Sequence, residues 1–139
     1  MDNEFAQSLY TRLEEATRPF NSVATVEVRE GHSKFPTQNY KYVNVTYVVT
    51  MPDVGSPNGH LMGIVADIEV WATGPNLALA EDVAQAVCSA LMGWNVNTVR
   101  QGTVRILRIS REAIPEADPE NVRLAHISLR ATGRAYRRT

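Results

Sequence analysis

Hydrophobic and polar positions alternate most clearly in the segment 64–72. A period of two residues is typical of a β-strand that buries only one face. The buried face would carry the apolar side chains of Ala66, Ile68, Val70 and Ala72, and the opposite face would carry Asp67, Glu69 and Trp71. The pair Gly74-Pro75 then interrupts the pattern. The segment therefore predicts a half-buried strand that ends at this pair.

Apolar residues return at helical spacing directly after the interruption. They occur at Leu77, Ala80, Ala84, Val87 and Leu91, which would place them along one face of a helix. Gly93 follows at a position where a helix C-terminus commonly takes a left-handed residue. We therefore predict an amphipathic helix through these residues.

The rest of the chain predicts one more helix and further strands. In the segment 2–15, Phe5, Leu9 and Leu13 are spaced by four residues, which indicates an N-terminal helix that Pro19 ends. Alternation and β-branched residues predict strands at 23–28, 40–51, 103–111 and 122–136. In 40–51 and 122–136 the alternation would place the following residues inward: Val43, Val45, Tyr47, Val49, Ile127, Leu129, Ala131 and Gly133. It would place the following residues outward: Tyr42, Asn44, Thr46 and Val48. The alternation slips between Ile106 and Leu107, which indicates either a β-bulge or a strand that is covered on both of its faces. The polar segments between the strands, including 95–102, are interpreted as loops or connections.

These elements predict an α+β fold. Most of the predicted strands have one polar, solvent-exposed face and one apolar, buried face, which favours antiparallel pairing. We therefore expect an antiparallel sheet of about four to five strands with both helices packed on one face, as a single pair of layers. The length of 139 residues suits one domain spanning 1–139.

Composition and charge constrain the function only loosely. The 44% hydrophobic and 21% charged content is typical of a globular protein. No apolar run reaches the roughly 20 residues of a membrane-spanning helix. Residues 1–99 carry eleven acidic and five basic side chains, whereas residues 100–139 carry four acidic and nine basic ones. This split fits head-to-tail contacts between copies, nucleic-acid binding or a solvated strand face.

No catalytic or metal-binding constellation emerges from the sequence. His32, His60 and His126 lie far apart without a second ligand type at metal spacing, so we expect surface imidazoles and no metal site. The single cysteine, Cys88, is interpreted as a small buried hydrophobic residue. The two carboxylates of the alternating strand are a possible acid–base pair, but the alternation already requires polar residues there. We predict a protein without catalytic residues, cofactor or metal.

Several segments together carry a family resemblance. The strand Ile64–Trp71 resembles an apolar–Asp–apolar–x–Val–Trp strand, and it is followed by the Gly74-Pro75 break and the helix. A strand at Val104–Ile109, an acidic turn at Glu116–Glu120 and a final strand through Leu129 close the pattern. In this order the chain resembles the tail-terminator, or tail-completion, proteins of long-tailed bacteriophages. The loops 31–39 and 52–63 depart from the family pattern, so contacts made there are the least transferable.

The resemblance implies a virion protein that is made and assembled in the cytoplasm of a bacterial host. It would form a ring, usually a hexamer, on the end of the tail tube at the tail–neck junction. Such a ring stops tube polymerisation and offers a surface to the head connector. Its partners would be further copies of itself, the tail tube protein and a neck protein, with DNA only passing through as cargo and no membrane involved. Alternatives are another neck or head–tail connector protein, a nucleic-acid-binding α+β domain, or a small enzyme or ligand-binding domain.

Head-to-tail assembly suggests a set of interface residues. Strand edges carry unpaired donors and acceptors, and a closed ring is one way to use them. We expect arginines of the C-terminal strands to lie near acidic positions of the next subunit, where charge sets the register and apolar burial supplies affinity. The candidates are Tyr42, Asp67, Glu69, Trp71, Arg123, Arg130 and Arg134, with Glu14 and Glu15 as further acidic positions.

Overall fold

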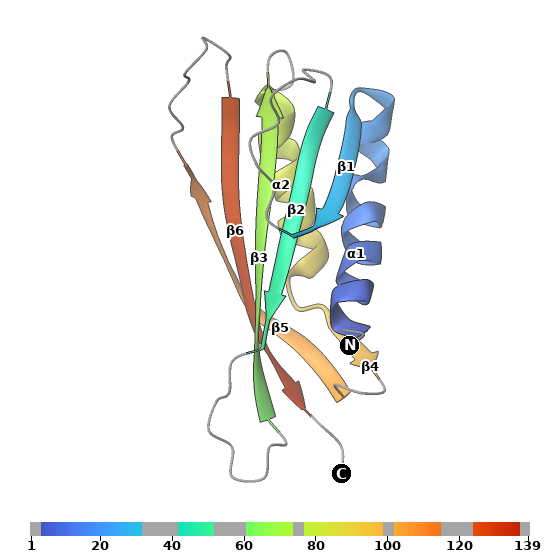
Figure 1. Cartoon of the computed structure of the whole chain (residues 1–139), viewed down its shortest axis with the longest axis vertical. Helices are drawn as coiled ribbons and strands as arrows, with labels where there is room; N and C mark the ends of the chain where they lie inside the picture. The colour runs from blue at the N-terminus through green and yellow to red at the C-terminus, as the bar shows by residue number, and fades with distance from the viewer. Residues whose placement is uncertain are drawn as a thin grey trace.

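The computed structural model describes residues 4–31, 42–51, 61–73, 77–98, 102–114 and 124–136. These ranges contain two α-helices, a short 3₁₀ helix and six strands (Figure 1). The elements are α1 Glu4–Thr17, η1 Arg18–Ser22, β1 Thr25–Glu30, β2 Tyr42–Thr50, β3 Leu61–Thr73, α2 Leu77–Leu91, β4 Asn95–Thr98, β5 Gly102–Ala113 and β6 Leu124–Tyr136.

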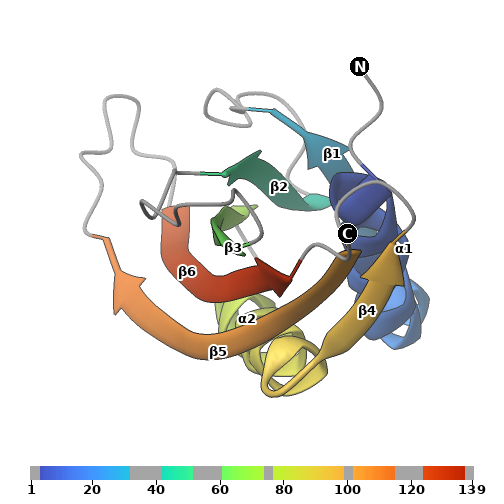
Figure 2. The same cartoon turned by 90° about the horizontal axis from the view of Figure 1, so that it is seen from below.

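The strands form one curled sheet in the order β1-β2-β3-β6-β5-β4. Both helices lie on the same side of this sheet (Figures 1 and 2). The predicted α+β class and its two layers are confirmed. Two details were wrong. Within the described residues, the sheet has six strands instead of four or five. In addition, β1 runs parallel to β2, while the other neighbouring described strands are antiparallel.

The strand missing from the prediction is β4, which was interpreted as a polar connection. Its four residues, Asn-Val-Asn-Thr, offer a single apolar side chain and therefore no alternation to detect. The strand pairs with the start of β5. The carbonyl of Trp94 extends this ladder by accepting a hydrogen bond from the N–H of Ile106 at 2.9 Å. Backbone pairing thus defines β4, and its one apolar side chain, Val96, packs partly against the core.

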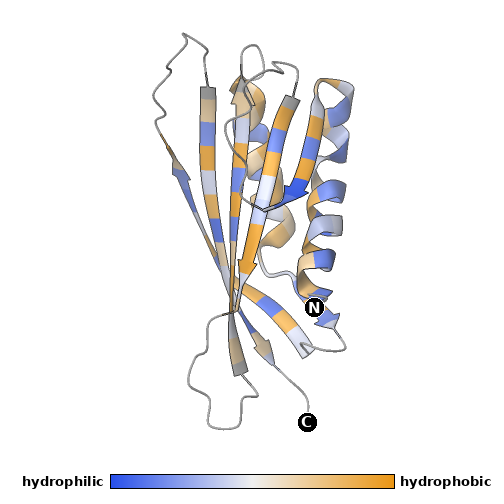
Figure 3. Ribbon diagram, in the orientation of Figure 1, coloured by the Kyte–Doolittle hydropathy of each residue, from blue (hydrophilic) through white to orange (hydrophobic). Residues whose placement is uncertain are grey.

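One hydrophobic core lies between the helices and the sheet. The predicted stripe of α1 is buried at Phe5, Leu9 and Leu13. The stripe of α2 is buried at Ala80, Val83, Ala84, Val87 and Leu91. The strands contribute the residues that were predicted to face inward, among them Val43, Val45, Tyr47, Ile68, Val70, Ile127, Leu129 and Ala131. Figure 3 shows the resulting alternation of apolar and polar bands along the strands.

The C-terminal end of α2 is joined to α1 by side-chain contacts. Gly93 follows the helix with a φ of 70°, the left-handed conformation that the sequence predicted. Arg12 donates a hydrogen bond from Nε to the carbonyl of Ala90 at 2.9 Å. The guanidinium of Arg12 also lies 5.5 Å from the centre of the Trp94 ring, and that ring packs against Phe5. These contacts fix the two helices beside each other.

A β-bulge interrupts the pairing of β5 with β6 between Ile106 and Arg108. The bulge explains why the alternation slips there, as the sequence indicated, and it leaves Leu107 54% exposed. On the partner strand, Gly133 lies against the backbone of β5. A Cβ atom at this position would be 2.1 Å from the carbonyl oxygen of Arg105. The two strands can therefore approach this closely because residue 133 has no side chain.

Candidate functional site

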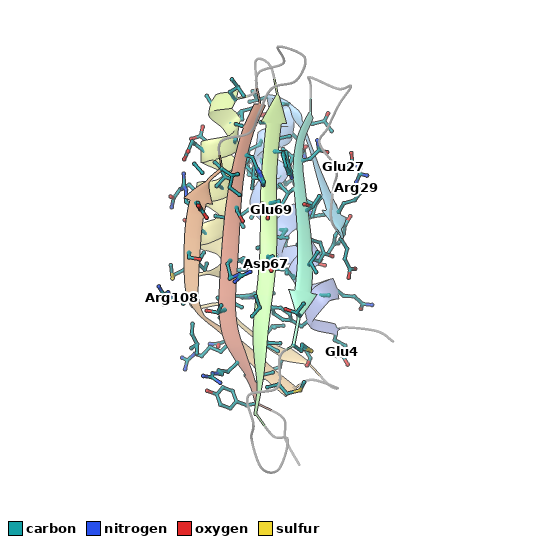
Figure 4. All side chains as sticks on the ribbon, turned by 60° about the vertical axis from the view of Figure 1, so that its left-hand side comes forward. Glu4, Glu27, Arg29, Asp67, Glu69 and Arg108 are labelled. Carbon is teal, nitrogen blue, oxygen red and sulfur yellow. The ribbon has the colours of Figure 1, made fainter. Side chains whose placement is uncertain are left out.

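The polar residues of the alternating strand lie at the centre of the outer face, which is the sheet face that points away from the helices (Figure 4). They come from β3, which is flanked by β2 and β6. The β3–β6 register places Trp71 opposite His126, Glu69 opposite Ser128, and Asp67 opposite Arg130. Directly opposite residues on antiparallel strands are close enough for their side chains to interact. Segments more than fifty residues apart in the chain thus build one polar cluster.

His126 lies opposite Trp71, at the end of this cluster away from Arg130, and is only 8% exposed. Its ring stacks on Trp71 with centroids 3.6 Å apart and an interplanar angle of 14°. Its Nε2 lies 2.5 Å from a carboxylate oxygen of Glu69, while the hydroxyl of Ser128 donates to the other oxygen at 3.1 Å. The expected surface imidazole is therefore wrong for His126, because the indole and the carboxylate together cover it.

Asp67 and Arg130 form an ion pair beside this cluster. The Arg130 Nε donates to Asp67 Oδ1 at 2.8 Å, and one terminal nitrogen lies 3.5 Å from Oδ2. The hydrogen bond to Asp67 and the charge of its carboxylate raise the pKa of Arg130. Both side chains remain partly or largely exposed, so solvent and salt screen the interaction. The pair aligns β3 with β6 more than it stabilises the fold.

The outer face is drier than its polar sequence suggested. Asn44 and Thr46 were expected to point outward, and on that face they are only 6% and 3% exposed. They lie opposite Trp71 and Glu69 in the β2–β3 register. Trp71 is itself 9% exposed, and its indole N–H has no hydrogen-bond partner within the described residues. The part of the outer face around Trp71 is therefore buried, although the helices cover only the opposite side.

A shallow open depression of about 650 Å³ lies on the outer face next to these pairs. Its lining consists of Asp67, Glu69, Ser110, Arg111, Glu112, Ser128 and Arg130. Acidic and basic groups are mixed along it, whereas small-molecule sites are usually enclosed and mainly apolar. Within the described residues, no group of three or more His, Cys, Asp and Glu side chains could hold a metal ion. The geometry favours a polar contact surface.

The remaining predicted residues lie apart from this cluster or outside the described ranges. Arg134 is on β6, opposite Gly63 and Arg105, towards the other end of the outer face. The strand β2 includes Tyr42, but the side chain of Tyr42 is not among those described, and Arg123, His32 and His60 lie outside the described residues. The interface roles of these residues and of Asp67, Glu69, Trp71 and Arg130 remain predictions.

Two residues of the cluster were not candidates in the sequence, namely His126 and Ser128. Both lie on β6 at positions that alternate with Arg130, so they share its face. Only the pairing register with β3 shows that they lie opposite Trp71 and Glu69. Cys88, by contrast, is half-buried on α2, and burial raises the pKa of its thiol. A raised thiol pKa disfavours the reactive thiolate, which agrees with the interpretation of Cys88 as a packing residue.

A second open depression lies between α1 and β1, and Tyr47 forms part of its lining. Burial of the phenol, followed by the charge of Glu30, raises the pKa of Tyr47 to about 12. An unfolded chain ionises this group near pH 10. The folded state therefore binds this proton more tightly than the unfolded chain does. The contribution of Tyr47 to the free energy of unfolding is complete below pH 10 and is lost as the pH rises towards 12.

Replacing Tyr47 with phenylalanine should remove this part of the alkaline loss of stability. Urea unfolding at pH 9, 10 and 11 checks the expectation, because the wild-type curve should fall more steeply with pH than that of Tyr47→Phe. The exposed Tyr136 provides the matched control. Tyr136→Phe should follow the wild type, and equal slopes for all three proteins would contradict the assignment.

Comparison with known proteins identifies a shared fold. No protein-family model matches the chain, and no curated protein matches its sequence. Among solved structures, the chain is similar to a chain of a particle described as "Virion of native gene transfer agent (GTA) particle". The two are 19% identical, the TM-score is 0.56, and the match covers 92% of this chain and 91% of the other. They share one fold. In addition, none of the described helices has the length and apolar character needed to span a bilayer.

Proposed function

We propose that this protein is a structural component of a phage-like virion, and more specifically a tail terminator. The observation that carries the proposal is the fold shared, over nearly the full length of both chains, with a chain of the gene transfer agent virion. The resemblance of the sequence to tail-terminator proteins supports the same assignment independently of that match. In this role the chain needs no catalytic residue, metal or cofactor.

As a tail terminator, the protein would form a ring on the end of the tail tube at the tail–neck junction. A hexamer is the usual number for such rings, so we propose six copies. The ring would bind the tube protein on one side and the head connector on the other, with DNA passing through as cargo. The shallow, charged depression on the outer face suits a contact surface better than a ligand pocket.

Tail-tube assembly with the cognate tube protein tests this proposal. Adding the folded chain to growing tubes should stop their elongation, and electron microscopy should show the protein at tube ends only. The Gly133→Ala variant, which is expected to be unstable, serves as the negative control. Tubes that keep growing with no protein at their ends would rule out tail termination. In that case, binding of the chain to added head connector protein would favour another neck protein.

A further inference from the structure

Over about half of its length, one edge of the strand β5 is paired with no other described strand. β6 pairs with it as far as Ala113, but β4 covers only the part from Gly102 to Arg105. Residues 107, 108 and 110–113 are exposed, and no described strand lies on that side. The N–H of Ile114 donates to the carbonyl of His126 on the β6 side at 2.8 Å. By alternation, the backbone groups of Ala113 and Arg111 point away from β6, towards the side where no described strand pairs with them.

The opposite margin of the sheet is formed by β1, whose second edge is paired with no described strand. The N–H of Gly31 donates to the carbonyl of Tyr47 on the β2 side at 2.8 Å, so the backbone groups of Glu30 and Val28 point away from β2. The N–H of Val26 is already bound by the side chain of Asn21 at 2.9 Å. The free part of this edge is therefore short and runs from Val28 to Glu30.

The two edges lie at opposite margins of the outer face, with Arg108 on one side and Glu27 and Arg29 on the other (Figure 4). A sheet with two free margins can be continued by further copies of the same chain. We propose that the free edge of β5 pairs with the β1 edge of the next copy, so that the sheet continues from subunit to subunit. This inference rests on the proposed ring assembly and names the surface through which the ring would form.

The direction of this pairing follows from the fold. If the next copy continues the sheet with the same face outward, its β1 runs in the same direction as β1 of the first copy. The sequence of parallel and antiparallel pairs across the sheet makes β5 antiparallel to β1. The junction between copies must therefore be antiparallel. The backbone groups of β5 that point away from β6 can then hydrogen-bond to the backbone groups of β1 that point away from β2.

Charge then selects the register. Outer-face and helix-face residues stay matched only when the strands shift in steps of two residues. One such register places Glu112 opposite Glu27, and a neighbouring one places Arg108 opposite Arg29; like charges in direct opposition are destabilising. The remaining register places Arg111 opposite Glu30, Glu112 opposite Arg29, and Ala113 opposite Val28. The ladder ends at the point where Asn21 already occupies the N–H of Val26.

In this register the new contacts extend existing charge pairs. On the outer face, Arg29 already binds Glu27 at 3.0 Å, and Glu112 of the neighbour joins that pair. On the helix face, Arg111 already binds Glu81 of α2, and Glu30 of the next copy joins it. A single junction contains only about four backbone hydrogen bonds, so free chains should be mainly monomeric in dilute solution. Closure of a ring on a tube end makes the contacts mutually supporting.

Disulfide trapping tests the register directly. In a Cys88→Ala background, Arg29→Cys and Glu112→Cys are combined in one chain, and the protein is oxidised in concentrated solution and on tube ends. Opposed residues that do not exchange hydrogen bonds have Cα atoms close enough for a disulfide. We expect a ladder of covalent multimers that stops at a closed ring. The control combines Arg29→Cys with Arg108→Cys, which belong to the rejected register, and should give at least about tenfold less product.

Self-pairing of two β5 edges is the competing arrangement, because it would place Arg108 opposite Glu112 in both directions. It would leave β1 open and stop at two copies. A single Ser110→Cys variant detects it, since Ser110 of both copies would then face each other. A dimer from Ser110→Cys, more product from the control pair, or no ladder from Arg29→Cys with Glu112→Cys would each overturn the proposal.

The two hypotheses can fail separately in these experiments. Tubes that are capped but give no ladder would remove this interface and leave the tail-terminator role intact. A ladder in concentrated solution without capping would support the interface and contradict the role. A protein that gives neither result would overturn both.

Discussion

Replacing Gly133 with alanine is expected to lower the free energy of unfolding by about 3 kcal/mol or more, at or above the upper end of the usual cost of overpacking. The added methyl group would lie 2.1 Å from the carbonyl oxygen of Arg105 and 2.9 Å from its carbon. Both atoms belong to the backbone of β5, so no side chain can move aside. The central strand β6 would have to separate from β5 at the bulge. Urea unfolding of the variant, followed by circular dichroism, measures this loss.

Gly93 provides the control for this experiment. Its φ of 70° disfavours any residue with a side chain, but a Cβ atom there would meet nothing within 4 Å. Gly93→Ala should therefore show the conformational penalty without a clash, about 1–2 kcal/mol. Equal losses for the two variants would show that the close approach of β5 and β6 is not what requires glycine at position 133.

Leu91→Ala is the second change with a large expected effect. Leu91 is 1% exposed at the end of α2 and belongs to the same core as Val87 and Ile68. Removing most of a buried leucine side chain loses its transfer free energy and leaves a cavity, so the cost should be about 2–5 kcal/mol. Chemical denaturation of both proteins under the same conditions gives this difference.

The adjacent Met92 offers a matched comparison because it is 60% exposed. Met92→Ala removes a side chain of similar size from solvent and should change stability by less than about 0.5 kcal/mol. If Leu91→Ala also cost well below 1 kcal/mol, α2 would not cover the sheet in the way that the structure places it.

The sequence predicted most of the fold because burial on one face leaves a regular pattern. The stripes of α1 and α2 and the inward residues of β2, β3 and β6 were identified from period alone. The same pattern records which face is buried but not the direction of a neighbouring strand. The parallel pairing of β1 with β2 therefore left no signal, and the short polar strand β4 left none either.

The candidate site was predicted less completely. Asp67, Glu69 and Trp71 were placed correctly on one strand face, since alternation determines the face. The sequence did not reveal that Trp71 stacks on His126 or that Glu69 reaches His126 and Ser128, because these contacts depend on the β3–β6 register. The sequence also did not reveal that the outward-facing residues Asn44 and Thr46 are buried, because their burial depends on the neighbouring strands. The neighbours across the strands determine whether an outward-facing side chain is exposed to solvent.

The strand order also determines when the protein can fold during synthesis. The strand β6, at residues 124–136, lies between β3 and β5. A nascent chain that has not yet released these residues contains β1, β2 and β3 as one group and β4 with β5 as another, with no strand to join them. Both groups would expose unpaired strand edges to solvent until β6 leaves the ribosome. The sheet therefore cannot be completed until β6 has been released, after the other five described strands.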